Sequence, residues 1–363
     1  MSAQRCEVLV VGGGPIGLAV ARALAHAEID VVVLDPDPGR GAAFAAAGIL
    51  SPTDPHEWVG PLGHFNIAAI DLWTAWAADL EAESGIAIRD QRGELRIGMA
   101  DSAFLSATRD GCKRAGWDVV SLDPTAATTL HTGLELPDDS QVLHLPMTAA
   151  VNVDLMTAAL RISLRDLGVQ IRPERAISSD LARRIIQTDQ SGWMFDRVVS
   201  ASGWTSDWLP RAERVPLKPM LGEAIIVHAA GHEHPSIPVR SSAGSIVPRS
   251  DGTVWLGTTV LDRDAENWPS AGSVSAILSR ALTLWPSLSD ARFAEARSGL
   301  RPMSPDHMPV IGPRGDVLVL AMGHGREGII QAPLTAELLR RGLVSERWDG
   351  VPAAFSPTRP LIQ

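Results

Sequence analysis

The sequence has 363 residues, 45% of them hydrophobic and 20% charged, which indicates a folded protein and not a disordered chain. A formal net charge of −10 argues against a nucleic-acid surface, which needs clustered positive charge, and favours small-molecule chemistry. The two cysteines, Cys6 and Cys112, are too few for a disulfide framework. Because the sequence shows no export signal and no apolar run as long as a membrane span, we expect a soluble cytoplasmic protein.

The first elements form a predicted strand, turn, helix and second strand. The apolar run Cys6–Val11 precedes Gly12-Gly13-Gly14-Pro15-Ile16-Gly17, a helix-forming run follows over 18–27, and the strand Val31–Leu34 ends at Asp35. This order is typical of a dinucleotide-binding unit. An ordinary strand–turn–helix connection, with glycines present only for packing, is the alternative.

Each part of this motif has a physical role in such a unit. Gly12 permits the tight turn, Gly14 lets the backbone approach a pyrophosphate, and Gly17 lets the helix pack close to the strand. The positive end of the helix faces the phosphates. The carboxylate of Asp35 would accept hydrogen bonds from ribose hydroxyls and repel a 2′-phosphate, which argues against NADP.

The later elements follow from periodicity and turn residues. A loop with a short helix is expected over 39–55. The predicted helices cover 66–85, 102–115, 154–167, 274–284 and 332–343. The predicted strands cover 93–98, 119–120, 143–153, 169–171, 196–203, 223–227, 245–248, 254–257 and 317–320, the last being the one strand expected after Arg301.

The order of these elements predicts an α/β fold with a second domain inserted into the first. The apolar strand over 196–203 ends in small residues, as expected of a chain that returns to the first sheet, and the alternating runs over 220–260 predict an antiparallel sheet that could cover a ligand cavity. We expect a Rossmann-like cofactor-binding domain with a parallel sheet, over 1–90, 141–215 and 296–363. The inserted α+β substrate-binding domain, with a mainly antiparallel sheet, covers 91–140 and 216–295.

A second glycine turn, Gly323-His324-Gly325-Arg326-Glu327-Gly328, lies between a predicted strand and a predicted helix. The sequence after it holds no clear further strand with a terminal acid, so a second nucleotide is not expected. We expect this helix N-terminus to point at the reactive ring of the same cofactor, because reduction of a flavin builds negative charge that a helix start stabilises. A plain strand-to-helix connection is the alternative.

Five motifs occur in the order seen in FAD-dependent amine oxidases and span nearly the whole chain. They are the two glycine turns, Ala45–Leu50, Val198–Gly203 and Ser298–Pro302. The chain resembles the D-amino acid oxidase and glycine oxidase family, and within it most closely glycine oxidase, whose product feeds the thiazole half of thiamine. The combination is specific for the family and much less specific for the substrate.

The resemblance implies a noncovalently bound FAD in an extended pose, with its ADP on the first glycine turn and Asp35 and its ring beside Ala46, Ala47 and Gly48. The first domain is then the FAD-binding domain. The residues implied in cofactor binding are Gly12, Gly14, Pro15, Ile16, Gly17, Asp35, Ala46, Ala47, Gly48, Ile49, Gly203, Gly325, Arg326, Glu327, Gly328 and Ile329.

The resemblance also implies that Arg301 binds the substrate carboxylate, with His324 and Ser245 as further candidate catalytic residues. A guanidinium matches two carboxylate oxygens, and such a contact contributes about 1.5–3 kcal/mol when shielded from water. A structural arginine is the alternative for Arg301. For His324 the alternative is a role in shaping the turn or in hydrogen bonding.

Three places depart from the family pattern. Ser245 stands where the family has an active-site tyrosine, and the sequence contains no tyrosine. Gly325 and Glu327 replace an aromatic residue and an asparagine that often flank the arginine of the late turn. Ala43 and Phe44 replace a threonine or serine pair, which leaves the flavin phosphates more dependent on backbone donors.

The expected function is FAD-dependent oxidative deamination of a small amino acid: glycine, a D-amino acid or an N-alkyl glycine. Dioxygen would reoxidise the cofactor, and the products would be an oxo acid, ammonia or an amine, and hydrogen peroxide. One alternative is an amino acid dehydrogenase, or an N-demethylating oxidase of the sarcosine oxidase type, that uses another electron acceptor. The other alternative is a flavin- or nucleotide-binding protein without turnover.

The preferred amine, its enantiomer and the oligomeric state are left open by the sequence, and a homo-oligomer is one option. His232 and His234 have alternate spacing but no third ligand nearby, so no metal site is expected.

Overall fold

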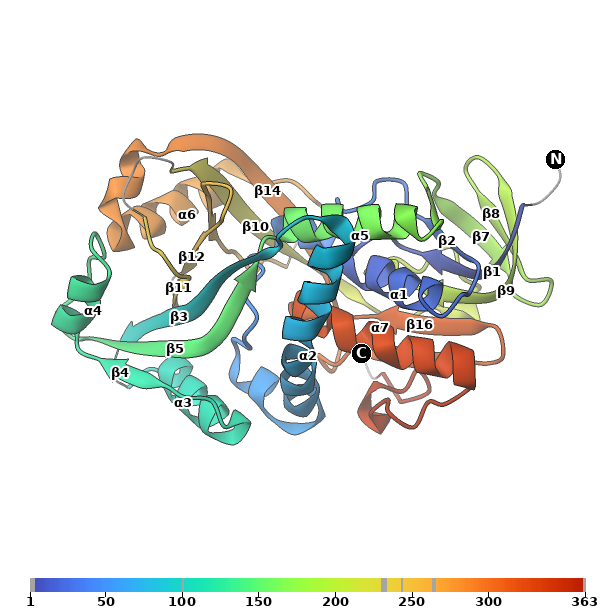
Figure 1. The fold of residues 1–363 in the computed structure, drawn as a ribbon, viewed down its shortest axis with the longest axis horizontal. Coiled ribbons are helices and arrows are strands. Elements are labelled where there is room, and N and C mark those ends of the chain that lie inside the picture. The colour runs from blue at the N-terminus through green and yellow to red at the C-terminus, as the bar shows by residue number, and fades with distance from the viewer. Residues whose placement is uncertain (1–3, 100, 230–233, 243, 263–265, 362–363) are drawn as a thin grey trace.

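The computed structural model describes residues 4–99, 101–229, 234–242, 244–262 and 266–361. Its strands form two sheets, which lie side by side with helices packed around them (Figure 1). One sheet is mainly parallel around its centre and the other is mainly antiparallel, so the predicted fold class is confirmed. His232 lies outside the described residues, whereas the ring Nδ1 of His234 lies 2.8 Å from the carbonyl oxygen of Pro235.

Sheet A contains the predicted strand–turn–helix–strand unit. In spatial order its strands are β15 (Val310–Arg314), β16 (Leu318–Met322), β9 (Gly192–Ser200), β1 (Gln4–Val11), β2 (Val31–Leu34) and β6 (Gln170–Arg172). β1 pairs in parallel with β2 and β9, and β9 pairs in parallel with β16. The chain therefore returns to the first sheet through β9, as predicted. A hairpin of β7 (Ala176–Asp180) and β8 (Ile185–Thr188) joins the sheet along β9.

Four helices cover one face of sheet A. They are α1 (Pro15–Ala25), α2 (Gly60–Ser84), α5 (Val153–Asp166) and α7 (Gly328–Ser345). Val8 and Val10 of β1 belong to the core under these helices, while Leu9 and Val11 face the opposite core. α1 begins three residues before the predicted helix because Pro15, which lacks an N–H, fits the first helical turn.

Sheet B lies beside sheet A. In spatial order its strands are β14 (Arg292–Met303), β10 (Lys218–His228), β13 (Thr253–Gly257), β12 (Gly244–Pro248), β11 (Val239–Ser241), β3 (Arg89–Met99), β5 (Ser140–Val151) and β4 (Val120–Leu122). All neighbours are antiparallel except β11 and β3. Three helices pack against this sheet: α3 (Ala103–Ala115), α4 (Pro124–Leu130) and α6 (Ala271–Leu284).

One face of sheet B packs against the segment that precedes α2. Trp255 and Val247 of this face contact Ala45 and Ile49, so sheet B approaches the first domain there. β5 and β14 hydrogen-bond within sheet B, although the predicted limits at 141 and 296 assign most of both strands to the first domain. The domain limits stay a prediction, and the strand pairing favours a division that keeps each sheet whole.

The prediction of a single strand after Arg301 is wrong. Arg301 itself lies in β14, and β15 precedes β16. β15 contains Gly312 and Pro313, which disfavour a strand in the sequence. Pro313 is tolerated because β15 is an edge strand in the described sheet order, where the missing N–H of proline leaves no neighbouring strand unpaired.

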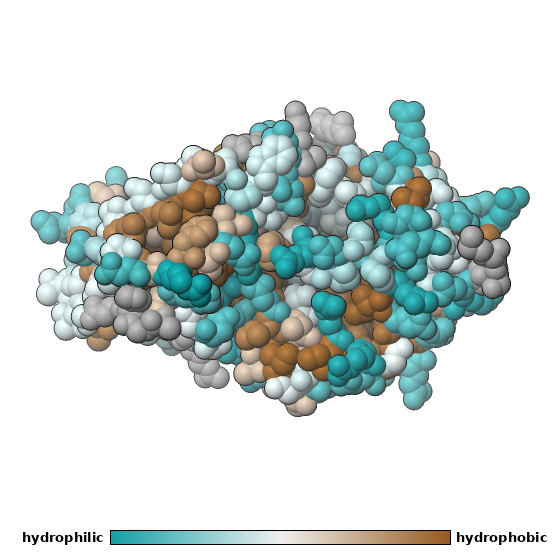
Figure 2. All heavy atoms as spheres, turned by 90° about the horizontal axis from the view of Figure 1, so that it is seen from above, coloured by the Kyte–Doolittle hydropathy of each residue, from teal (hydrophilic) through white to brown (hydrophobic). Residues whose placement is uncertain are grey.

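The surface is mixed in character. Seen from above, apolar side chains gather mainly over the half of the molecule that contains sheet B, and hydrophilic side chains dominate the other half (Figure 2). Among the described residues, every helix falls short of the length and apolar character that a membrane crossing requires.

Candidate active site

A cavity of about 560 Å³ connects the two glycine turns. Gly14 and Asp35 line it beside the first turn, and Arg301, His324 and Gly328 line it beside the second. Its other walls come from η1 (Ala42–Ala45), from the start of β7 and from the segment that follows β9. Segments far apart in the sequence thus form one elongated site.

The first glycine turn has the packing that the motif predicts. A Cβ added to Gly12 would lie 2.2 Å from the carbonyl oxygen of Ala201, and one added to Gly17 would lie 1.9 Å from that of Gly12. A Cβ on Gly14 would meet no protein atom within 4 Å, and this residue lines the cavity. Gly12 and Gly17 therefore hold the turn and helix together, while Gly14 leaves space for a ligand.

The helices that open on the cavity have free N-termini. The N-caps of α3, α4, α5 and α6 are side chains that accept backbone N–H groups: Ser102, Asp123, Asn152 and Ser270. α1 and α7 have no such side-chain cap, and neither has α2. The uncapped starts of α1 and α7 lie where Gly14 and Gly328 line the cavity, so their N–H groups can bind an anion.

Asp35 lies at the end of β2, as predicted. Its Oδ2 accepts the N–H of Gly13 at 2.6 Å, and its Oδ1 accepts that of Asp37 at 2.8 Å. These two bonds orient the carboxylate at the cavity wall. A ribose hydroxyl in the cavity could donate to the remaining lone pairs of the same oxygens.

Arg301 presents a partly buried guanidinium to the cavity. It donates to the hydroxyl of Thr258 at 3.0 Å and to the carbonyl of Thr259 at 3.2 Å, and a Cβ on Gly222 would lie 2.3 Å from its Nη2. Within the described ranges it forms no ion pair with a carboxylate. Burial, and then repulsion from Arg326, lowers the pKa of Arg301 to about 10. A partly buried guanidinium without an ion-pair partner favours binding of a carboxylate.

Arg326 and Glu327 connect the second glycine turn to η2 (Pro55–Trp58) and the residue before it. Arg326 forms an ion pair with Asp54. Glu327 is buried beside Glu57, and burial together with the Glu57 charge raises the pKa of Glu327 well above its usual value. Glu57 accepts the N–H groups of Thr53 and Asp54 at 2.7 and 2.8 Å.

Of the other two candidate catalytic residues, His324 lines the cavity and Ser245 does not. His324 is buried, and its Nε2 lies 3.2 Å from the hydroxyl of Thr335 in α7. Burial lowers the pKa of His324 to about 3, so its ring is neutral and fixes the turn against the helix. Ser245 lies in β12 opposite Arg240 and Gly257 and does not line the cavity.

The cavity brings together most of the predicted cofactor residues. Those that line it are Gly12, Gly14, Pro15, Ile16, Asp35, Ala46, Gly203, Gly325, Arg326, Gly328 and Ile329. The others, which support the lining from behind, are Gly17, Ala47, Gly48, Ile49 and Glu327. Trp204, Trp208 and the β7 residues Ala176 and Ile177 also line the cavity. They were not predicted, because their positions depend on tertiary contacts that no local pattern indicates.

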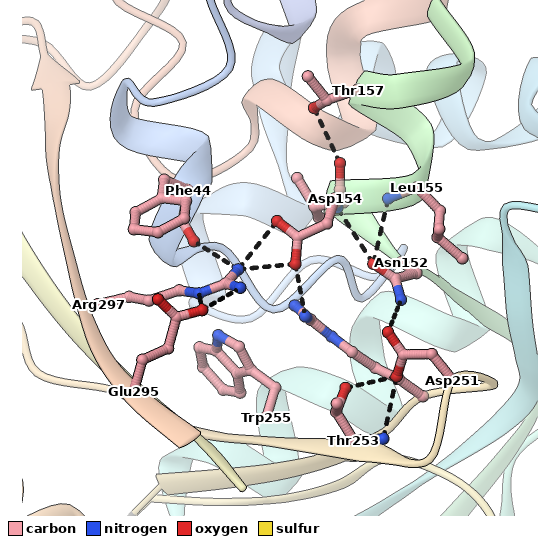
Figure 3. Close-up of polar contacts among 12 residues, drawn as sticks. Phe44, Asn152, Asp154, Leu155, Thr157, Asp251, Thr253, Trp255, Glu295 and Arg297 are labelled. Carbon is pink, nitrogen blue, oxygen red and sulfur yellow. Dashed lines mark hydrogen bonds and ion pairs between the residues drawn. The ribbon is translucent and has the colours of Figure 1, made fainter. Parts of the chain in front are cut away.

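An ion-pair network supports the η1 wall from behind (Figure 3). Asp154, at the start of α5, accepts from Arg249 at 3.0 Å and from Arg297 at 2.8 and 2.9 Å. Arg297 also donates to the carbonyl of Phe44 at 3.2 Å and to Glu295 at 2.6 Å. We call these five residues the Asp154 network. It connects α5, sheet B and η1, and it was not predicted.

A possible metal cluster also deserves a physical test. Ligand atoms of Asp54, His56 and Glu57 lie within 4.8 Å of one another. The two carboxylates are already engaged by Arg326 and by backbone N–H groups. These oxygens therefore serve the structure of η2, and we assign no metal to them.

Comparison with known proteins agrees with this geometry. The sequence profile of a family described as FAD dependent oxidoreductase matches residues 7–341. The chain belongs to this family. The predicted family, enzyme class and cofactor are thereby confirmed: the protein is an FAD-dependent oxidoreductase.

Several relatives are similar over nearly the whole chain. The glycine oxidase of Geobacillus kaustophilus is 29% identical, over 99% of this chain and 98% of its own. Its crystal structure superposes with a TM-score of 0.90 and 25% identity, covering 99% of this chain and 100% of that one. The bifunctional protein ThiO/ThiG of Synechocystis sp. is also 29% identical, over 98% of this chain but 54% of its own, so the chain spans about half the length of such relatives.

The residues present fit FAD. The space beside Gly14 and the uncapped start of α1 suit the pyrophosphate, Asp35 suits the ribose, and the uncapped start of α7 suits an anionic ring. The fit rests on backbone donors, because Ala42, Ala43, Ala45 and Ala46 in the adjoining wall offer no side-chain hydrogen bonds.

Proposed function

We propose that this protein catalyses the oxidative deamination of an amino acid or N-alkyl glycine whose carboxylate binds Arg301. The products would be an oxo acid, ammonia or an amine, and hydrogen peroxide from dioxygen. The observation that carries the proposal is the partly buried guanidinium of Arg301 in the cavity wall, which has no carboxylate ion-pair partner among the described residues. The glycine oxidases among the relatives support it.

The residues of the chain would bind and orient the substrate. Thr258 and Thr259 fix the guanidinium of Arg301, whose remaining N–H groups can take two carboxylate oxygens. Bound FAD supplies the two-electron acceptor for the amine. The start of α7 offers N–H groups where negative charge accumulates, and neutral His324 keeps that turn in place without adding charge.

An amino acid panel tests the proposal. Purified protein should be yellow, and anaerobic mixing with its substrate should bleach the visible flavin band. In air the same substrate should yield hydrogen peroxide. If little hydrogen peroxide forms but the amount of oxo acid rises when an artificial electron acceptor is added, the result would favour a dehydrogenase. Protein that stays colourless after incubation with FAD would contradict the proposal.

Replacement of Arg301 tests the anchor. We expect Arg301→Ala to lower kcat/KM for carboxylated amines by about 10- to 100-fold, because one charge-assisted contact is lost. Arg301→Lys should retain part of the activity, since a lysine keeps the charge but not the bidentate geometry. Arg183→Ala, at an exposed arginine in the turn between β7 and β8, is the control. Unchanged activity of Arg301→Ala would remove the carboxylate assignment.

A further inference from the structure

A second cavity, of about 700 Å³, adjoins the first. It lies among η2, the chain leading into β10 and the end of β14. Arg301 and Arg326 line both cavities. A ligand whose carboxylate binds Arg301 could therefore extend into either space.

The second cavity is largely apolar. Its lining includes Pro216, Leu217, Pro219, Met220, Val260 and Met303. Of the charged groups in its wall, Asp54 pairs with Arg326, Glu57 accepts backbone N–H groups, and Lys218 pairs with Asp262. The wall thus offers apolar surface next to the guanidinium of Arg301, which has no carboxylate partner in the described part of the chain.

Gly325, in the wall of the first cavity, lies next to a residue of the second. A Cβ on Gly325 would lie 3.1 Å from the sulfur of Met303, which lines the second cavity. A larger side chain at position 325 would therefore press on Met303. Glycine at this position avoids that contact.

On the basis of the proposed function, we propose that the substrate is an amino acid with a large apolar group on its nitrogen or Cα. Its carboxylate binds Arg301 and its apolar group occupies the second cavity. Glycine, which has no side chain, would leave most of this cavity to water. Burial of a phenyl-sized group should therefore favour the larger substrate by at least tenfold.

Binding of simple carboxylates tests the second cavity without turnover. Acetate and phenylacetate both offer a carboxylate to Arg301, and perturbation of the flavin absorbance of the holoenzyme measures their Kd. We expect phenylacetate to bind at least tenfold more tightly than acetate. Equal affinities would overturn the proposal.

A valine-to-tryptophan pair provides the matched control. Val260 lines the second cavity and is 53% exposed, so Val260→Trp should fold normally and narrow the cavity. We expect it to weaken phenylacetate at least fivefold and to leave acetate within twofold. Val344→Trp, at a 44% exposed valine in α7, should change neither. Equal losses in both variants would overturn the assignment of the cavity.

Turnover separates this proposal from the proposed function. The panel is the achiral series glycine, N-methylglycine and N-benzylglycine, with both enantiomers of alanine and phenylalanine. We expect kcat/KM to rise with the apolar group and Val260→Trp to reverse the order. If glycine or N-methylglycine is the best substrate, the inference fails while the proposed function stands. If no amine bleaches the flavin but phenylacetate binds as expected, the proposed function fails while the cavity assignment stands.

Discussion

Glu327, in the second glycine turn, should make the stability of the protein depend on pH. Its carboxyl group is buried beside Glu57, and burial raises its pKa above the ordinary value of 4.5. The folded protein therefore holds a proton that the unfolded chain releases. This contribution to stability is fully present below the unfolded pKa and is lost as the pH rises through the folded pKa.

Glu327→Gln tests this coupling. The amide is a neutral replacement for the protonated carboxyl, so we expect the variant to have a higher Tm than the parent at pH 8 and a similar Tm at pH 5. Thermal unfolding followed by circular dichroism from pH 5 to 9 measures the difference. Glu346→Gln, at an exposed residue after α7, is the control. Parallel curves for Glu327→Gln and the parent would show that Glu327 is ionised in the fold.

The glycines of the first turn have separable roles. Gly17→Ala places a Cβ 1.9 Å from a backbone oxygen, so we expect loss of stability by more than about 2 kcal/mol. Gly14→Ala meets no protein atom, so the fold should remain and the Kd for FAD should rise at least tenfold. Chemical denaturation of the apoprotein and fluorescence titration with FAD measure the two effects. Gly272→Ala, in α6 with open space around it, should change neither adversely.

Residues that act on near neighbours in the sequence could be predicted. The roles of Gly12, Gly14 and Gly17 follow from one turn, whereas the expected role of Arg301 comes from the family resemblance of the motif around it. The ion pairs around the cavity could not be predicted, because Arg326 and Asp54 are 272 residues apart in the sequence and Arg297 and Asp154 are 143 residues apart. Such pairs depend on the register of packed elements, which no local pattern determines.

At the scale of elements, the Asp154 network fixes η1 against α5 and sheet B. The side chains of Arg249 and Arg297 are only 2% and 9% exposed, so removal of the Asp154 charge leaves two guanidiniums poorly compensated. We expect Asp154→Asn to lower the free energy of unfolding by about 2 kcal/mol. Because η1 lines the cofactor cavity, the Kd for FAD should rise as well.

Asp166→Asn is the matched control for this prediction. Asp166 lies on the same helix, is 54% exposed and pairs with a neighbouring arginine at the surface. We expect its effect on stability to stay within about 0.5 kcal/mol. If the two variants lose the same stability and bind FAD equally well, the Asp154 network does not position η1.

Three helices were predicted closely, whereas α4 was missed. α3, α5 and α6 begin and end within three residues of their predicted limits, because each shows an apolar stripe at helical spacing. The hairpin of β7 and β8 was missed, since its half-exposed residues show no clear alternation. Part of the cavity wall was missed with this hairpin, because β7 contributes residues to that wall.

At the scale of the whole molecule, the two sheets meet at the cofactor cavity and divide its tasks. Sheet A and its helices supply the glycine turns and Asp35, while sheet B supplies Arg301. The sequence predicted two separate sheets, because the strand–turn–helix unit is local and the alternating strands indicate a second sheet. The predicted limit at 296, however, assigned Arg301 to the first domain, whereas Arg301 lies in β14 of sheet B. The sequence could not predict the strand order of sheet B, where β3 pairs with β11 across more than a hundred residues.

The strand order of sheet A has a consequence for how the enzyme matures. β1 lies between β2 and β9, and β16 comes from the last quarter of the chain. During synthesis the ribosome therefore releases the first glycine turn and Asp35 long before the second glycine turn. The complete cavity can form only after almost the whole chain has been translated, so we expect cofactor binding to be a post-translational step.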